Sequence, residues 1–139
     1  MSGVVLDSSF IIAVLVEEEH SDFARAIMLQ LDGDSMMAPG LLAWEIVNVL
    51  QKKVRQKRLT LAQRAVMLSR FESLAITLQP TPEAGELGFL IDLCDRHGLT
   101  GYDAAYLLLA LDEGVALASL DDDLVAAARA EGLTVHSPF

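Results

Sequence analysis

Short apolar runs that alternate with longer helical stretches constrain the fold of this chain more than any other feature of its sequence. The runs are predicted to be strands, because each is short, apolar and bounded by turn residues; they cover 4–6, 36–38, 75–78, 115–118 and 133–135. Between them, apolar residues recur at three- and four-residue spacing, as on one face of a helix. The alternation predicts an α/β domain whose central, mainly parallel sheet is flanked by helices.

The helical stretches carry start and stop signals. Ser8 and Ser9 offer capping hydroxyls to a helix over 10–16, and Thr60 is suited to cap one over 61–73. Further helices are expected over 20–31, from Leu41 onward, around 87–94, over 104–111 and over 124–130. Turn and break signals separate them at 32–34, 39–40, 80–82, 98–101 and Gly114.

The composition fits a single globular domain over residues 1–139. A chain of 139 residues with 53% hydrophobic residues can bury a substantial core. No uncharged apolar run reaches the length of about 18 residues that a transmembrane helix needs, and the first residues lack the basic region of a signal peptide. The single cysteine, Cys94, has no partner for a disulfide within the chain, and we expect it to be an inert core residue. We therefore expect a cytoplasmic protein without membrane association.

Four acidic residues lie where apolar runs end or helices begin: Asp7, Glu45, Asp103 and Asp121. Asp7 and Asp121 follow two predicted strands, and in parallel α/β folds ligands gather at the carboxyl ends of strands. Each acid alone also suits a helix cap, a turn or an exposed helix position. Together they predict a carboxylate cluster, and such a cluster normally needs a cation to offset the repulsion. Carboxylate oxygens suit Mg²⁺ or Mn²⁺, which points to metal-assisted phosphate chemistry.

The basic residues are concentrated in one stretch of an otherwise acidic chain. The net charge of −10 argues against a protein that coats nucleic acid. Seven of the ten basic residues nevertheless fall between 52 and 70, beginning with Lys52, Lys53 and Arg55. This stretch is either a solvated helix face or a local patch that steers phosphate groups on an otherwise acidic body.

The remaining polar and aromatic residues carry weaker signals. His20, His97 and His136 have no Cys or His partner at zinc-ligand spacing, so we expect them in surface or loop positions. Trp44 and Tyr106 are expected in the core or at a dimer contact, not as platforms for base stacking.

The acids and their neighbours resemble the PIN-domain ribonucleases, especially the VapC-type toxins of bacterial toxin–antitoxin pairs. The matching segments are 5–9 (VLDSS), 39–45 with Asn48, 102–106 (YDAAY) and 117–121 (LASLD). They occur in the family's order across nearly the whole chain. The resemblance implies a PIN-like three-layer fold in which a central, mainly parallel sheet lies between helices.

The resemblance also implies roles for individual residues. The family's four-acid pattern falls on Asp7, Glu45, Asp103 and Asp121, with Asp7, Asp103 and Asp121 as ligands of Mg²⁺ or Mn²⁺. Asp121 is chosen over the adjoining acids at 122 and 123, which could share its role, because it follows Ser119 at the family's spacing. Three polar side chains are expected to support the site: Ser8, Asn48 and Ser119.

The activity that the resemblance implies is metal-dependent endoribonuclease activity. A metal-activated water, held by the four-carboxylate site, would hydrolyse RNA phosphodiesters and leave a 5′-phosphate and a 3′-hydroxyl. The implied partners are RNA, a cognate antitoxin protein and a second copy of the chain in a homodimer.

Three alternatives remain open at this point. One is a PIN nuclease that processes RNA or DNA and is not a toxin. Another is a PIN-like interaction domain without catalysis, against which the intact acid set argues. The third is a receiver-type signalling domain, which would normally need adjacent acids after the first strand and a late lysine. Here Ser8 and Ser9 follow Asp7, and no lysine follows Lys57.

Overall fold

A computed structural model describes residues 3–31 and 34–139, in which strands and helices alternate as predicted. The strands are β1 (Gly3–Leu6), β2 (Ser35–Pro39), β3 (Thr77–Gln79), β4 (Ala116–Ala118) and β5 (Val135–His136). The helices are α1 (Ser8–Leu15), α2 (Ser21–Gln30), α3 (Leu41–Arg55), α4 (Leu61–Ser73), the short 3-10 turn η1 (Ala84–Glu86), α5 (Leu87–His97), α6 (Gly101–Glu113) and α7 (Asp122–Ala130). Of the predicted turn at 32–34, residues 32 and 33 lie outside the described residues.

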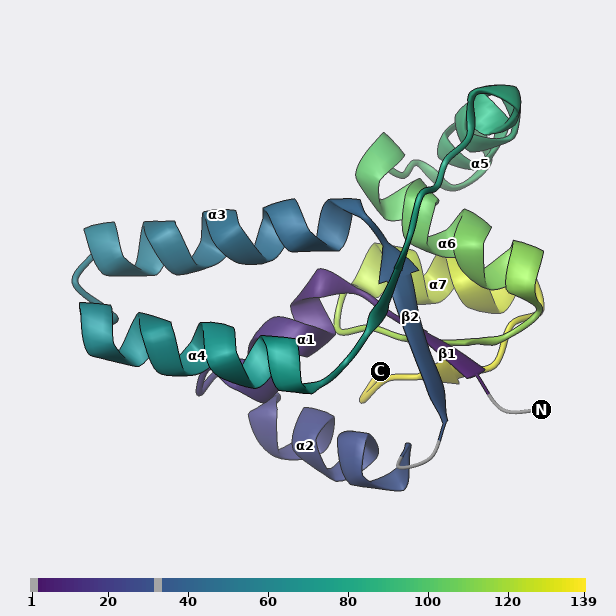
Figure 1. Cartoon of the computed structure of the whole chain (residues 1–139). Helices are drawn as coiled ribbons and strands as arrows, with labels where there is room; N and C mark the ends of the chain where they lie inside the picture. Colours follow the sequence, from purple (N-terminus) through teal and green to yellow (C-terminus); the bar gives the residue numbers. More distant parts are fainter. Residues whose placement is uncertain (1–2, 32–33) are drawn as a thin grey trace.

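The five strands form one parallel sheet in the order β3-β2-β1-β4-β5. Helices α1 to α4 lie on one side of the sheet, and α6 and α7 lie on the other (Figure 1). The chain therefore has the expected three-layer α/β fold. Because β1 is central, it pairs with β2 on one side and with β4 on the other, with Leu6 opposite Ala118.

The core lies around β1 and α6. Val4, Val5 and Leu6 are fully buried, as expected for a strand that is covered on both faces. All seven residues of α6 from 104 to 110 are buried as well, which agrees with the nearly continuous apolar character of that segment. Gly114, with a φ of 64°, adopts the left-handed conformation that ends α6 and turns the chain into β4. Within the described residues, none of the helices combines the length and apolar character needed to cross a bilayer.

Several element boundaries differ from the prediction for local reasons. The cap of α1 is the Asp7 carboxylate and not a serine hydroxyl, so the helix begins at Ser8. Thr100, not Asp103, caps α6, and residue 101 lies inside the helix. Ala75 has a φ of 54°, which no strand residue adopts, and β3 therefore begins at Thr77. The predicted cap of α4 is confirmed, because Thr60 and Gln63 form a reciprocal capping box.

Candidate active site

Two of the predicted acids meet at one edge of the sheet because β1 and β4 are adjacent. The backbone N–H of Asp7 donates to the carbonyl of Ala118 at 3.1 Å, which holds the ends of the two strands together. Asp7 is the first residue after β1, and Ser119 is the first after β4. The sequence from 119 onward therefore reaches the Asp7 carboxylate although it is more than 100 residues away in the chain.

The Asp7 side chain is buried, with 3% exposure, and its carboxylate is held by three donors. Oδ1 accepts hydrogen bonds from the Ser9 hydroxyl at 2.7 Å and from the Phe10 N–H at 3.0 Å. Oδ2 accepts one from the Ser119 hydroxyl at 2.7 Å. Because a carboxylate has about four acceptor positions, one position on Oδ2 remains for a ligand. Burial and, to a smaller extent, the charge of nearby Asp121 raise the pKa of Asp7 to about 6 against the opposing effect of these hydrogen bonds.

Ser9 is a site residue that the sequence analysis did not select. Its hydroxyl donates to Asp7 and accepts from the N–H of Leu120 at 3.0 Å, so it joins the two strand ends. Ser8, which was selected, lies instead beside Glu45 and lowers the pKa of that carboxyl. The signal for Ser9 was its spacing: a hydroxyl two residues after a capping aspartate can return to the same carboxylate.

Glu45 projects from α3 and is held by Tyr106 of α6. The Tyr106 hydroxyl donates to Oε1 of Glu45 at 2.5 Å, across 61 residues of sequence. Partial burial raises the pKa of Glu45, the Tyr106 hydrogen bond lowers it, and the charge of Asp103 raises it. Tyr106 is 1% exposed, so its prediction as a core residue is confirmed. Its hydroxyl role was missed, although a buried tyrosine normally requires a partner for its O–H.

Asp103 lies in the first turn of α6 and faces the other acids. Its backbone N–H donates to the Thr100 hydroxyl at 3.2 Å, which leaves the Asp103 carboxylate free of a capping role. Burial raises the pKa of Asp103, and the charges of Asp121 and Asp123 raise it further. Asp103 is therefore within electrostatic reach of Glu45 and of the residues that follow β4.

Asp121 caps α7 and also lies near Asp7 and Asp103. Its Oδ1 accepts from the Leu124 N–H at 3.0 Å, and its own N–H donates to the Ser119 hydroxyl at 3.0 Å. Its charge raises the pKa of both Asp7 and Asp103. The charge of Asp123 raises the pKa of Asp103 but not that of Asp7, and Asp122 is exposed. Of the three successive acids, Asp121 is thus the one whose charge acts on both of the other predicted ligands.

The four acids are near neighbours, but they do not form a closed set of metal ligands. Within residues 3–31 and 34–139, no three His, Cys, Asp or Glu side chains are grouped closely enough for a ready-made metal site. The donor set still suits Mg²⁺, which commonly takes one or two carboxylates directly and keeps several waters. An all-oxygen site with a free position on Asp7 Oδ2 fits that kind of binding.

Other side chains that were singled out from the sequence are not hydrogen-bonded to the four acids in the described part of the chain. Asn48 is exposed on α3, and its side chain makes no hydrogen bond among the described residues. Trp44 has 74% of its surface exposed, so it does not lie in the core, and the other expected place for it, a dimer contact, stays a prediction. Cys94 packs partly buried against the core.

The histidines lie apart from the acids. His97 is half-buried at the end of α5 with Nε2 2.6 Å from the Glu131 carboxylate, instead of in a loop. His20 precedes α2, with its ring against that of Phe139, and His136 ends β5.

The sequence was compared with known families, and a family model described as "PIN domain" matches residues 4–130. The chain belongs to the PIN domain family. Over 121 residues this PIN domain is 33% identical to Ribonuclease VapC3 of Pyrobaculum aerophilum, an alignment that covers 87% of this chain and 91% of that protein. The resemblance to VapC-type PIN proteins is therefore confirmed, and the receiver-domain alternative is wrong.

Two solved structures share the PIN fold. PAE2754 from Pyrobaculum aerophilum superimposes with a TM-score of 0.69 at 23% identity, covering 96% of this chain and 90% of that one. FitAcB from Neisseria gonorrhoeae gives a TM-score of 0.68 at 17% identity, covering 97% of each chain. At these identities the likeness shows the fold alone.

Proposed function

We propose that this PIN domain is a metal-dependent endoribonuclease that acts as the toxin of a toxin–antitoxin pair. The observation that carries the proposal is the buried Asp7 carboxylate, which three donors fix while one position on Oδ2 stays open. A buried carboxylate with a raised pKa is unfavourable by itself and is stabilised by a cation. The relative named Ribonuclease VapC3 supports ribonuclease chemistry for such a site.

The proposed ligands of Mg²⁺ or Mn²⁺ are Asp7, Asp103 and Asp121. When bound, the ion would lower the pKa of a coordinated water and offset the negative charge that develops on the phosphate. The chain supplies the orientation: Ser9 and Ser119 fix Asp7, and Ser119 also fixes the backbone of Asp121.

Glu45 is the proposed acceptor of the proton from the attacking water. Its raised pKa makes it a better base than an exposed glutamate. The Tyr106 hydroxyl binds Oε1 of Glu45, so Oε2 would be the atom that accepts the proton or holds a water. Ser8 lies beside the same carboxylate, and Asn48, one turn along α3 from Glu45, is proposed as a further donor that supports the site.

The test is RNA cleavage by purified variants in Mg²⁺. Asp7→Asn and Asp103→Asn should abolish cleavage while the circular dichroism spectrum stays that of the wild type. Asp122→Asn, which removes an exposed acid from the first turn of α7 next to Asp121, is the matched control and should retain activity. Cleavage by Asp7→Asn at the wild-type rate would refute the site.

The proposed partners are single-stranded RNA, an antitoxin protein and a second copy of this chain. For RNA, the steering residues are Lys52, Lys53 and Arg55 at the end of α3. Their joint replacement by alanine should weaken RNA binding and flatten its salt dependence.

Exposed apolar side chains such as Trp44 and Phe89 support self-association, which light scattering would measure. Growth arrest on expression, relieved by Asp7→Asn, would separate a toxin from an RNA-processing enzyme.

A further inference from the structure

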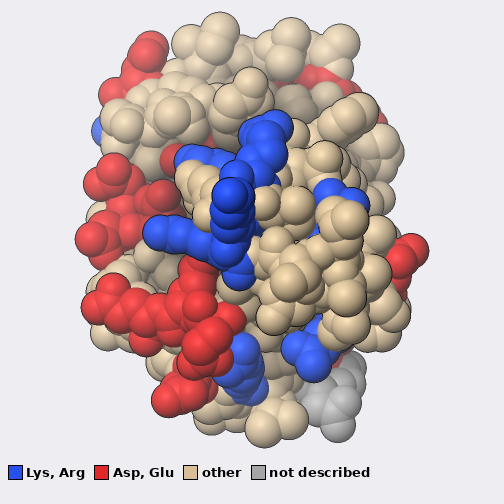
Figure 2. Space-filling model, turned by 90° about the vertical axis from the view of Figure 1, so that its left-hand side faces the viewer, with Lys and Arg blue, Asp and Glu red and all other residues tan. Residues whose placement is uncertain are grey.

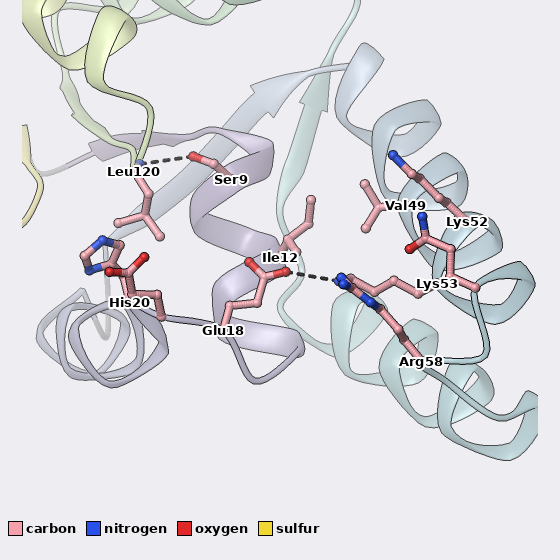
Figure 3. A pocket seen from close by; sticks show the side chains of 11 residues that line it. Ser9, Ile12, Glu18, His20, Val49, Lys52, Lys53, Arg58 and Leu120 are labelled. Carbon is pink, nitrogen blue, oxygen red and sulfur yellow. Dashed lines mark hydrogen bonds and ion pairs between the residues drawn. The ribbon is translucent and has the colours of Figure 1, made fainter.

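A pocket of about 540 Å³ lies next to the candidate active site, between the start of α2 and the end of α3 (Figure 3). Lys52, Lys53 and Arg58 line the wall formed by α3 and the turn after it, and Glu18 faces them from the segment between α1 and α2. The volume is within the range of about 300–1,000 Å³ that is usual for ligand sites. On the surface the basic residues form a compact group that borders a band of acids (Figure 2).

The pocket and the candidate active site share Ser9. The Ser9 hydroxyl binds the Asp7 carboxylate at 2.7 Å and receives the N–H of Leu120, and both Ser9 and Leu120 line the pocket. At its Ser9 end the pocket is therefore separated from Asp7 by one side chain, while Lys52 and Arg58 lie on the opposite wall (Figure 3). If an extended RNA strand placed one backbone phosphate at Asp7, the adjacent phosphate would lie along the pocket.

The charges in the pocket are not equally available. Lys53 Nζ lies 3.2 Å from a Glu18 carboxylate oxygen, and the Lys53 side chain is only 13% exposed. The salt bridges within the described residues include neither Lys52 nor Arg58. Two cations are thus free to bind an anion, while a third is neutralised by the opposite wall.

We propose that this pocket binds an RNA backbone phosphate adjacent to the cleaved one, with Lys52 and Arg58 as its contacts. The Glu18–Lys53 ion pair competes with the phosphate for Lys53 and so weakens binding in the free protein. Because the whole chain carries a net charge of −10, an RNA strand is repelled by most of the surface and is held at this localised basic wall. The inference rests on the proposed ribonuclease function and assigns a binding site to it.

The experiment measures binding of a short fluorescent single-stranded RNA by Asp7→Asn protein in EDTA, over a series of KCl concentrations. Lys52→Ala/Arg58→Ala should raise Kd roughly tenfold. It should also flatten the slope of log K against log salt by about 1.4, or about 0.7 for each lost contact with a single strand. Arg70→Ala removes an exposed cation of the same basic stretch that does not line the pocket, and it should change Kd less than about twofold.

The ion pair provides a second and opposite test. Glu18→Gln frees Lys53 and should lower Kd roughly two- to fivefold. In a Lys53→Ala background the same substitution should give a smaller gain, because it then removes only the repulsion between Glu18 and the phosphate. An unchanged salt slope in Lys52→Ala/Arg58→Ala would overturn the pocket assignment, and an equal gain from Glu18→Gln in both backgrounds would overturn the competition for Lys53.

Failure of the pocket is distinguishable from failure of the ribonuclease function. Cleavage of the same RNA by the wild-type protein in Mg²⁺ tests the chemistry without reference to the pocket. If the wild-type protein cleaves the RNA but Lys52→Ala/Arg58→Ala leaves the salt slope of binding unaltered, the pocket assignment is refuted and the ribonuclease function stands. Binding that depends on Lys52 and Arg58 without any cleavage would refute the chemistry and support the pocket.

Discussion

The buried Asp7 carboxylate should make the metal-free protein more stable in mild acid than at neutral pH. Its pKa is raised from 3.8 to about 6 in the folded state, so the folded protein takes up a proton that the unfolded protein still lacks. The destabilisation is present in full above pH 6 and is relieved as the pH falls through 6 toward 3.8. The raised pKa of Asp7 lowers the free energy of unfolding by about 3 kcal/mol at high pH, and about 2 kcal/mol of this loss is recovered between pH 7.5 and 4.5.

The assay is urea unfolding of wild type and Asp7→Asn in EDTA at those two pH values. Asp7→Asn keeps the shape of the side chain but does not titrate, so the difference between the two proteins isolates the contribution of this group. The free energy of unfolding of Asp7→Asn minus that of the wild type should be about 2 kcal/mol larger at pH 7.5 than at pH 4.5. This difference corresponds to roughly 6–10 °C in Tm.

Asp122→Asn is the matched control, because it removes an exposed acid at the same edge of the sheet. Its stability relative to wild type should change little between the two pH values. An identical pH response of wild type and Asp7→Asn would refute the reasoning, since it would mean that the carboxylate does not titrate differently on folding.

Three further outcomes are expected. Mn²⁺ should raise the Tm of the wild type by relieving carboxylate repulsion, and an equal shift in Asp7→Asn/Asp103→Asn would exclude that cause. Tyr106→Phe should preserve the fold but lower kcat, and the effect should disappear in a Glu45→Gln background; additive losses would mean that Tyr106 does not act through Glu45. Thr60→Ala should lower the free energy of unfolding by about 1 kcal/mol through loss of the α4 cap, measured in urea; no change would show that the cap is not stabilising.

The sequence carried most of the information about the fold because its signals are local. Strand 4–6 and helix 104–110 are apolar throughout, and their burial on all sides follows from that composition. Thr60 was predictable as a cap because the capping box lies within four residues. Ala75 was misassigned because its positive φ is imposed by the end of α4 and the entry into β3, which residue type does not reveal.

The candidate site was predictable in its acids but not in their supports. Asp7 and Asp121 follow strands, and parallel topology brings strand ends together. The choice of Ser9 over Ser8 depends on which way two successive hydroxyls point once the helix begins at Ser8. The Tyr106 hydrogen bond to Glu45 joins two helices on opposite sides of the sheet, and no local pattern encodes it.

The pairing of β1 with β4 has a consequence for when the protein becomes active during its synthesis. Ser119, which holds the Asp7 carboxylate, leaves the ribosome 112 residues after Asp7. A nascent chain that lacks β4 has neither the β1–β4 strand pair nor the complete acid set. The proposed nuclease site is therefore incomplete for most of translation, and it forms in one late step when β4 and the segment after it fold against β1.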